Sequence, residues 1–203
     1  MRQIVLATRN HGKIAEFERL LAEYASDIQV LGLSDFPDLP DVDEIGSTFA
    51  ENALLKAREV SAYTNLAAIA DDSGLCIDFL GGDPGIFSAR WSGTHGDDAA
   101  NISKVLAQLI QVPESERTAS FKCAVALHLP DGRELVQMGH LPGHITLQPR
   151  GSAGFGYDPI FQPDGSDLTL GEFGPGEKDK ISHRGQALRS IAPQLNEILV
   201  TGR

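Results

Sequence analysis

Residues 4–24 read IVLATRNHGKIAEFERLLAEY, and this stretch decides the fold class. The four apolar residues at 4–7 have the length of a buried strand, and apolar residues then recur at helical spacing from Ile14 to Tyr24. The polar residues between the two patterns predict a loop. Strand, loop and helix in this order are typical of an α/β fold.

The middle of the chain continues the alternation of helices and strands. Thr48 is followed three residues later by Glu51, which is the spacing of a capping box, and the pattern predicts a helix through Val60. Apolar runs at 66–70 and 75–80 have strand length and are separated by polar residues that halt the first run. The chain is therefore expected to return from helix to strand here.

The second half of the chain has the same character. Asp97 or Asp98 can cap a helix, and residues 120–129 and 134–140 predict two strands joined by a Pro-Asp-Gly turn. A last helical pattern contains Pro193, which is predicted to kink or break the helix. Helices alternating with strands and one hairpin predict an α/β fold on a mixed β-sheet.

Composition limits the possible functions. The chain has 203 residues, 41% of them hydrophobic, which suffices for one core and a single domain over residues 1–203. Its 17 Lys and Arg against 28 Asp and Glu give a net charge of −11, which argues against extended nucleic acid as a partner. The first residues form neither a secretory signal nor a membrane span, so we expect a cytoplasmic protein with no membrane partner.

Two cysteines lie within apolar runs without metal-ligand spacing around them. Cys76 is part of GLCIDFL and Cys123 is part of FKCAVAL. A cytoplasmic compartment keeps thiols reduced, so both are interpreted as small buried hydrophobic residues and not as a disulfide.

The turn TRNHGK, from Thr8 to Lys13, is the first candidate site. A turn between a strand and a helix directs free N–H groups and the positive end of the helix dipole toward one point, where an anion can bind. It is not a Walker A loop, because Ala7 and Ile14 stand where that motif needs Gly and Ser or Thr. Taken alone, the turn is equally consistent with an ordinary connection carrying a solvated Lys13.

The second candidate is ADDSG, residues 70–74, where two adjacent carboxylates end an apolar run. Carboxylate oxygens suit Mg²⁺, which also keeps waters and substrate phosphate in its shell, and Glu44 could supply another ligand. A turn in which Asp71 or Asp72 caps local backbone amides is the competing interpretation.

Three further patterns are weaker by themselves. Thr48, Asn52 and Lys56 are spaced by four and share one helix face, which is either functional or simply solvated. The stretch GFGYDPIF, residues 154–161, offers an aromatic ring between glycines that could stack on a base or fill the core. In SHRG, residues 182–185, two cationic or donor side chains occupy a first helical turn, where cations are disfavoured unless an acceptor is near.

Together these segments resemble, in the same order, the inosine triphosphate pyrophosphatase family. The matching stretches are LATRNHGKIAEF, STFAENALLKA, IADDSGLCID with LGGDPGIFSARWSG, FKCAVAL, GFGYDPIF and ISHRGQAL, and they span almost the whole chain. The resemblance implies an elongated mixed α/β fold with two lobes and a central cleft, and a homodimer. It also implies hydrolysis of non-canonical purine nucleoside triphosphates (ITP, dITP, XTP) to the monophosphate and pyrophosphate, which keeps deaminated purines out of nucleic acid precursors.

The resemblance also implies roles for individual residues. Glu44 and Asp72 would hold Mg²⁺, with Asp72 as the catalytic proton acceptor, and Phe155 would stack on the purine. The residues implied to bind substrate are Thr8, Arg9, Asn10, His11, Gly12, Lys13, Lys56, Ser73, Phe155, Gly156, Tyr157, Asp158, Lys178, His183 and Arg184.

The sequence departs from the family pattern at two places. Ile45 stands where the family commonly has Thr, which removes a hydroxyl next to Glu44. Extra glycines in GEFGPGEKDK make Lys180 a competitor of Lys178, and Lys178 is preferred because it keeps the family's distance to SHRG.

Two other functions stay open: a nucleotide-binding regulator without catalysis, and a pyrophosphatase for other modified nucleotides. The acid pair with Lys13 and Lys56 argues against the regulator, and the complete FGYD and SHRG signatures argue against the other pyrophosphatase.

Overall fold

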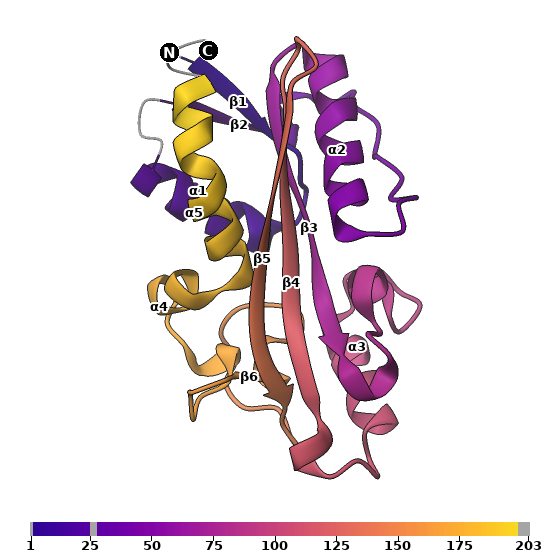
Figure 1. Cartoon of the computed structure of the whole chain (residues 1–203). Coiled ribbons are helices and arrows are strands. Elements are labelled where there is room, and N and C mark those ends of the chain that lie inside the picture. Colours follow the sequence, from indigo (N-terminus) through magenta and orange to yellow (C-terminus); the bar gives the residue numbers. More distant parts are fainter. Residues whose placement is uncertain (1, 25–27, 199–203) are drawn as a thin grey trace. The chain divides into compact units, whose positions relative to one another are not determined.

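The computed structural model describes residues 2–24 and 28–198 and shows an α/β fold (Figure 1). The elements are β1 Arg2–Leu6, α1 His11–Tyr24, β2 Ile28–Gly32, α2 Phe49–Thr64, β3 Ala67–Ile77, α3 Asp98–Gln108, β4 Thr118–His128, β5 Glu134–Ile145, β6 Phe161–Pro163, α4 Pro175–Ile181 and α5 His183–Asn196. The strand order is β2-β1-β3-β4-β5-β6, with β1 parallel to β2 and β3, and β5 antiparallel to β6. The predicted α/β class and mixed sheet are confirmed.

The chain packs as two compact units. The first unit comprises residues 1–72, 123–139 and 184–203, and the second comprises residues 73–122 and 140–183. The boundaries fall inside β3, β4 and β5, so each of these strands supplies residues to both units. The expectation of a single domain over residues 1–203 stays a prediction.

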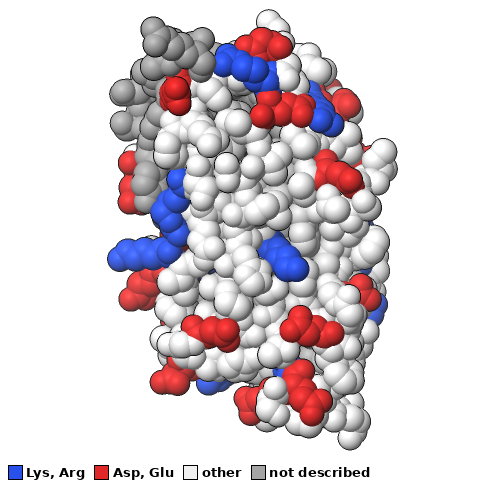
Figure 2. Space-filling view, viewed as in Figure 1, with Lys and Arg blue, Asp and Glu red and all other residues white. Residues whose placement is uncertain are grey.

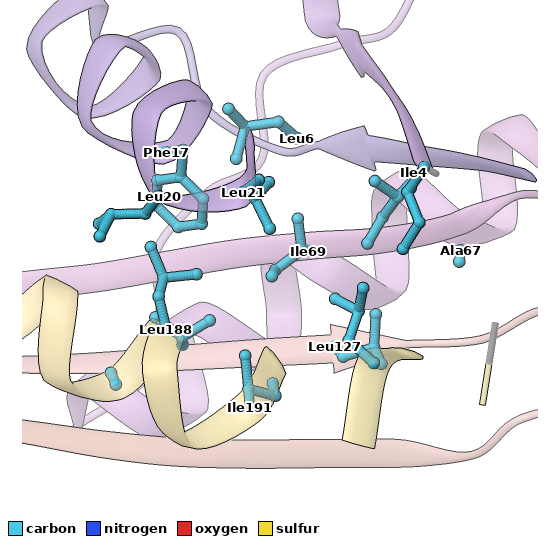
Figure 3. Close-up of a cluster of buried hydrophobic side chains, with 14 of the residues drawn as sticks. Ile4, Leu6, Phe17, Leu20, Leu21, Ala67, Ile69, Leu127, Leu188 and Ile191 are labelled. Carbon is cyan, nitrogen blue, oxygen red and sulfur yellow. The ribbon is translucent and has the colours of Figure 1, made fainter. Parts of the chain in front are cut away.

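The first unit is built on parallel strands covered by helices. Ile4 of β1 pairs with Val30 of β2 and with Ala67 of β3. Residues of α1 and α5 pack on the strands in one apolar cluster, in which Phe17 and Leu188 face Ile69 (Figure 3). Helix α2 lies on the other side of these strands (Figure 1).

The boundaries of α2 follow from local hydrogen bonds. The Thr48 hydroxyl accepts from the Glu51 N–H at 3.1 Å, as the capping pattern predicts, but the Glu51 carboxylate accepts from the Ser47 N–H at 2.7 Å. The helix continues past Val60 to Thr64, where Asn65 adopts a left-handed conformation with φ 55°.

The second unit has its own apolar core. Phe121 of β4 contacts Phe161 of β6 with ring centroids 4.7 Å apart. In the antiparallel pairing of β5 with β6, Gly143 lies so close to the neighbouring strand that a Cβ would sit 2.3 Å from the Gln162 carbonyl. The buried Arg117 guanidinium donates to three backbone carbonyls, which provide hydrogen-bond acceptors for its buried N–H groups.

Two local expectations differ from the structure, and three short elements were not expected. Asp71 and Asp72 do not halt a strand, because β3 runs through both of them from Ala67 to Ile77. Pro193 does not break the last helix, since α5 continues to Asn196. The short strands β2 and β6 and the seven-residue helix α4 were not predicted from the sequence.

Surface charge agrees with the composition. On the face drawn in Figure 2, the Lys and Arg side chains of the described residues are scattered among Asp and Glu side chains and form no continuous patch. Among the described residues, we also find no helix with the length and apolar character needed to cross a bilayer.

Phe17→Ala should lower the free energy of unfolding by about 3–5 kcal/mol, because it removes a fully buried ring from the cluster of the first unit. Urea denaturation followed by circular dichroism measures this loss. The matched control on the exposed side of α1 is Glu18→Ala, which should change the value by less than about 0.5 kcal/mol. Equal losses in the two variants would contradict the packing described.

Candidate functional site

The loop between β1 and α1 is held by its own side chains. The Asn10 carboxamide accepts a hydrogen bond from the Lys13 N–H at 3.1 Å and so caps α1, which begins at His11. The Asn10 N–H in turn donates to the Thr8 hydroxyl at 3.2 Å. The turn predicted to bind an anion is therefore a defined backbone structure at a helix N-terminus.

Arg9 leaves this turn and contacts the acidic loop of the first unit. Its Nε lies 2.7 Å from Asp41 Oδ1, and its Nη2 donates to the Leu39 carbonyl at 3.0 Å. Because both side chains of this ion pair are well exposed, the pair contributes little to stability. A negatively charged ligand could therefore compete for Arg9.

A fully buried carboxylate, Asp71, organises the charges behind the loop. Asp71 Oδ2 lies 3.0 Å from Lys13 Nζ and 3.0 Å from both Nε and Nη2 of Arg184. The remaining guanidinium nitrogen of Arg184, Nη1, forms a very short ion pair with the buried Glu16. Glu16, Arg184, Asp71 and Lys13 thus form one continuous charge network inside the first unit.

The charge states of this network follow from its contacts. Burial would raise the pKa of Asp71, but the cations of Lys13 and Arg184 outweigh burial and hold this pKa well below its usual value. For Arg184, burial would lower the pKa, but Asp71 and Glu16 outweigh it and raise the pKa. Burial and the charge of Asp71 raise the pKa of Cys123, whose protonated Sγ lies 3.9 Å from Asp71 Oδ2.

Asp72 belongs to a second set of polar residues in the first unit. The Asn52 side-chain amide donates to Asp72 Oδ2 at 3.0 Å, and its oxygen accepts from the Gly46 N–H at 2.8 Å. Lys56 Nζ lies 2.6 Å from Glu44 Oε1 and 3.9 Å from Asp72 Oδ1. Two members of the polar stripe, Asn52 and Lys56, are therefore not merely solvated, because they point at the acidic residues, whereas Thr48 is exposed and caps the helix.

The two acids of β3 differ in their electrostatic environment. Burial raises the pKa of Asp72, and the nearby Lys56 and Lys13 offset that effect only in part. Burial would lower the pKa of Lys56, but Asp72, Glu44 and Asp71 together raise it, so Lys56 keeps its charge. Asp72 is therefore the more basic of the two acids. A basic carboxylate next to the positive charge of Lys56 is suited to proton transfer.

The predicted metal ligands fit a hard cation. Glu44 and Asp72 both contact Lys56, so two carboxylates converge on one place that already holds a positive charge. Among the described residues, no group of three or more His, Cys, Asp and Glu is arranged to hold a metal by itself. Mg²⁺ accepts two carboxylate ligands when water and substrate phosphate supply the rest of its coordination shell.

The second unit gathers the predicted base-binding residues. Asp158 Oδ2 accepts from the Phe155 N–H at 2.9 Å and lies 2.6 Å from Lys178 Nζ. Lys178 Nζ also lies 4.6 Å from the centre of the Phe155 ring, close enough for a cation–π contact. Lys178 is buried whereas Lys180 is exposed, so the structure associates the preferred lysine with the aromatic residue.

Other residues of this unit are fixed by aromatic and backbone contacts. The buried His183 ring stacks on Phe121 with centroids 4.7 Å apart and an interplanar angle of 7°. The Tyr157 hydroxyl donates to the Ser88 carbonyl at 2.8 Å, and Ser73 is half-buried within β3.

The predicted site residues therefore fall into two sets. The set in the first unit is Thr8, Arg9, Asn10, His11, Gly12, Lys13, Glu44, Lys56, Asp72 and Arg184. The set in the second unit is Ser73, Phe155, Gly156, Tyr157, Asp158, Lys178 and His183. Arg184, which was grouped with His183 on sequence grounds, contacts Asp71 and Glu16 of the first unit.

Three residues with clear parts in these sets were not among the predicted site residues. Asp71 and Asn52 lie inside motifs that the sequence pointed out, and the spacing of Asn52 from Lys56 on α2 was the signal for it. Glu16 lies one helical turn after Lys13 in an otherwise ordinary amphipathic pattern, so only its contact with Arg184 identifies it.

The sequence matches a known family over nearly its whole length. The sequence model of the Ham1 family matches residues 4–194. A dITP/XTP pyrophosphatase from Streptomyces avermitilis is 53% identical, with 98% of this chain and all of the relative aligned. A dITP/XTP pyrophosphatase from Streptomyces coelicolor is 51% identical over the same shares of both chains.

Solved structures agree with the sequence matches. A HAM1 protein from Coxiella burnetii is 44% identical and superimposes with a TM-score of 0.87, covering 97% of this chain and all of that chain. A dITP/XTP pyrophosphatase from Mycobacterium abscessus is 49% identical, with a TM-score of 0.77 over 94% of this chain and 99% of that chain.

Asp71→Asn should lower the free energy of unfolding by about 3–5 kcal/mol at pH 7, because Lys13 and Arg184 lose their buried carboxylate. Since the folded-state pKa of Asp71 lies below its unfolded value, this stabilisation is complete above the unfolded pKa and is lost as the pH falls toward the folded one. The difference between wild type and variant in urea denaturation should therefore narrow below about pH 5.

The matched control is Asp38→Asn, at an exposed position of the same unit, which should change stability by less than about 0.5 kcal/mol. A wild type–Asp71→Asn difference that stays constant from neutral to strongly acidic pH would show that the Asp71 charge is not the stabilising element.

Proposed function

Because this chain belongs to the Ham1 family, we propose that it is a nucleoside-triphosphate pyrophosphatase that acts on non-canonical purine nucleotides. Its substrates would be ITP, dITP and XTP, and its products the monophosphate and pyrophosphate. Relatives about half identical over their full length are named dITP/XTP pyrophosphatases, which supports this proposal. It would keep deaminated purines out of the precursors of DNA and RNA.

The observation that carries this proposal is the arrangement around Lys56. One lysine contacts two carboxylates, Glu44 and Asp72, and the second of these is held by Asn52 and has a raised pKa. A protein that only binds nucleotides has no use for a basic carboxylate oriented in this way. This arrangement favours catalysis over the regulator considered from the sequence.

The chain's own residues account for the elements of phosphoryl transfer. Asp72 would accept a proton from the attacking water, whose oxygen bonds to a phosphoryl phosphorus while a bridging P–O bond breaks and pyrophosphate leaves. Lys13 and Lys56 would bind the charged phosphate oxygens and hold the triphosphate in line. Mg²⁺, held by Glu44 and Asp72, would neutralise charge on the phosphates and on the leaving group.

Residues 8–13, which form the turn after β1 and the start of α1, would bind the triphosphate. The helix N-terminus at His11 and the charge of Lys13 both favour an anion. Arg9 would exchange its exposed partner Asp41 for a phosphate oxygen. Ile45 offers no hydroxyl and is 84% exposed, so the metal shell near Glu44 would rely on water at that position.

Residues of the second unit would bind the purine and sugar. Phe155 would stack on the base, with Gly156, Tyr157, Asp158 and Lys178 completing its surroundings, and Ser73 touching substrate. A 6-oxo purine presents an acceptor where adenine presents a donor, so a buried donor selects for it. His183 and Arg184 are both candidates for that donor.

The remaining expectations are part of the same proposal. We expect the enzyme to work in the cytoplasm as a homodimer on a small-molecule substrate, with neither nucleic acid nor membrane as a partner. Size-exclusion chromatography with light scattering measures the oligomeric state.

Wild-type protein with Mg²⁺ should hydrolyse ITP, dITP and XTP far faster than ATP, GTP and TTP, and chelation by EDTA should abolish turnover until Mg²⁺ is restored. Asp72→Asn should lower kcat by roughly 10²–10⁴-fold with KM largely kept, because the proton acceptor is lost. Chromatography of the nucleotide products measures both.

The matched control is Asp78→Asn, an exposed acid just beyond the end of β3, which should retain wild-type kcat. Near-normal turnover by Asp72→Asn would exclude Asp72 as the catalytic acid or base. No turnover of any nucleotide by the wild type would favour the regulator.

His183→Ala should lower the ratio of kcat/KM for ITP over ATP by roughly tenfold or more, because the acceptor at position 6 loses a buried donor. The same ratio in Arg184→Ala tests the other candidate, with urea denaturation as a check that the variant is folded. A ratio that Arg184→Ala leaves unchanged would remove Arg184 from base recognition and leave it only its contacts with Asp71 and Glu16.

A further inference from the structure

The turn that carries Phe155 in the second unit is wrapped tightly around a carboxylate. Gly154 and Gly156 both have left-handed backbones, with φ of 75° and 61°. A Cβ on Gly154 would lie 1.9 Å from Asp158 Oδ2, the atom that accepts the Phe155 N–H. Both neighbours of Phe155 therefore adopt backbone conformations that favour glycine. The hydrogen bonds of the turn then determine how the Phe155 ring is oriented.

A second carboxylate holds this turn from outside. Asp98, the first residue of α3, accepts the Gly156 N–H at 2.6 Å through its Oδ2. The helix does not need Asp98 as its cap, because Asp97 already fills that role by accepting the Ala100 N–H at 3.0 Å. The Asp98 side chain is therefore not required to cap α3, and it binds the turn at Gly156 instead.

The next residue is anchored as well. The Tyr157 hydroxyl donates to the Ser88 carbonyl at 2.8 Å. Burial raises the pKa of Tyr157, and the charge of Asp98 raises it further, so the phenol stays a proton donor. Phe155, Gly156 and Tyr157 are thus fixed by three different partners, Asp158, Asp98 and Ser88.

We propose that Asp98 is a positioning residue for purine binding: by holding the Gly156 N–H it fixes the Phe155 ring beside Lys178 as a stacking surface. The inference rests on the proposed function, since it assigns Phe155 to the base. It adds a residue from α3 that the sequence motifs do not include. The Gly156 N–H is consequently occupied by the protein, and Gly156 contributes to the site through its backbone conformation.

Asp98→Ala should raise KM for dITP roughly tenfold and leave kcat within about threefold, because a base on a mobile ring loses part of its stacking energy. Asp98→Asn keeps an acceptor oxygen and should restore most of the affinity. Inorganic tripolyphosphate, a competitive probe without a base, should inhibit the wild type and Asp98→Ala with the same inhibition constant. Steady-state kinetics gives all three values.

The matched control is Asp97→Ala, which removes the cap of α3 and should lower thermal stability without changing KM for dITP. If Asp98→Ala does not fold, Asp98→Ser carries the same expectation, because it keeps a polar side chain at the first residue of α3 but its hydroxyl is too short to reach Gly156.

An unchanged KM for dITP in Asp98→Ala would overturn the role of Asp98. An equal rise in KM for dITP and in the inhibition constant of tripolyphosphate would overturn it as well. Both outcomes leave the proposed pyrophosphatase activity in place. A rise in KM for Asp97→Ala equal to that of Asp98→Ala would also overturn it, as a general effect of helix stability. A wild type that hydrolyses no purine triphosphate would overturn the proposed function and this inference together.

Discussion

The ion pair of the buried Asp71 carboxylate with Lys13 and Arg184 is the interaction on which the first unit depends. A carboxylate without any exposure is tolerated only when cations compensate for the water it has lost. Lys13 comes from the first turn of α1, Asp71 from β3 and Arg184 from the start of α5, so one carboxylate joins three elements that are far apart in sequence. The segment proposed to bind phosphate is thereby tied to the strand that carries Asp72.

In the second unit, a buried acid likewise holds the turn that carries Phe155. There Asp158 is buried, and its partners are Lys178 and the N–H of Phe155. In each unit a buried acid holds a lysine, and Asp158 also accepts a backbone N–H. Polar groups that are satisfied in this way hold one geometry more firmly than apolar contacts, which tolerate sliding. Positioning of this kind is what catalysis by binding and electrostatics requires.

The periodic patterns of the sequence predicted the α/β class, the first helix, α2, α3 and the hairpin, because these elements depend on local spacing. Local spacing did not predict that β3 continues through Asp71 and Asp72. Two adjacent acids are expected to end a buried strand unless cations from distant parts of the sequence compensate for their charge. The short strands β2 and β6 hold too few residues to show a period. The ordered motifs indicated the members of the candidate site. They did not indicate that Arg184 contacts Glu16 and Asp71, because these are tertiary contacts across 168 and 113 residues of sequence.

Within the charge network of the first unit, Asp71 holds Lys13 in place. A double-mutant cycle with Lys13→Met, Asp71→Asn and the double variant, measured by urea denaturation at pH 7, tests it most directly. We expect that the two losses of stability do not add, with a coupling free energy of about 1–3 kcal/mol between Lys13 and Asp71. Losses that add to within about 0.5 kcal/mol would contradict it and would leave Lys13 as a solvated side chain of an ordinary turn.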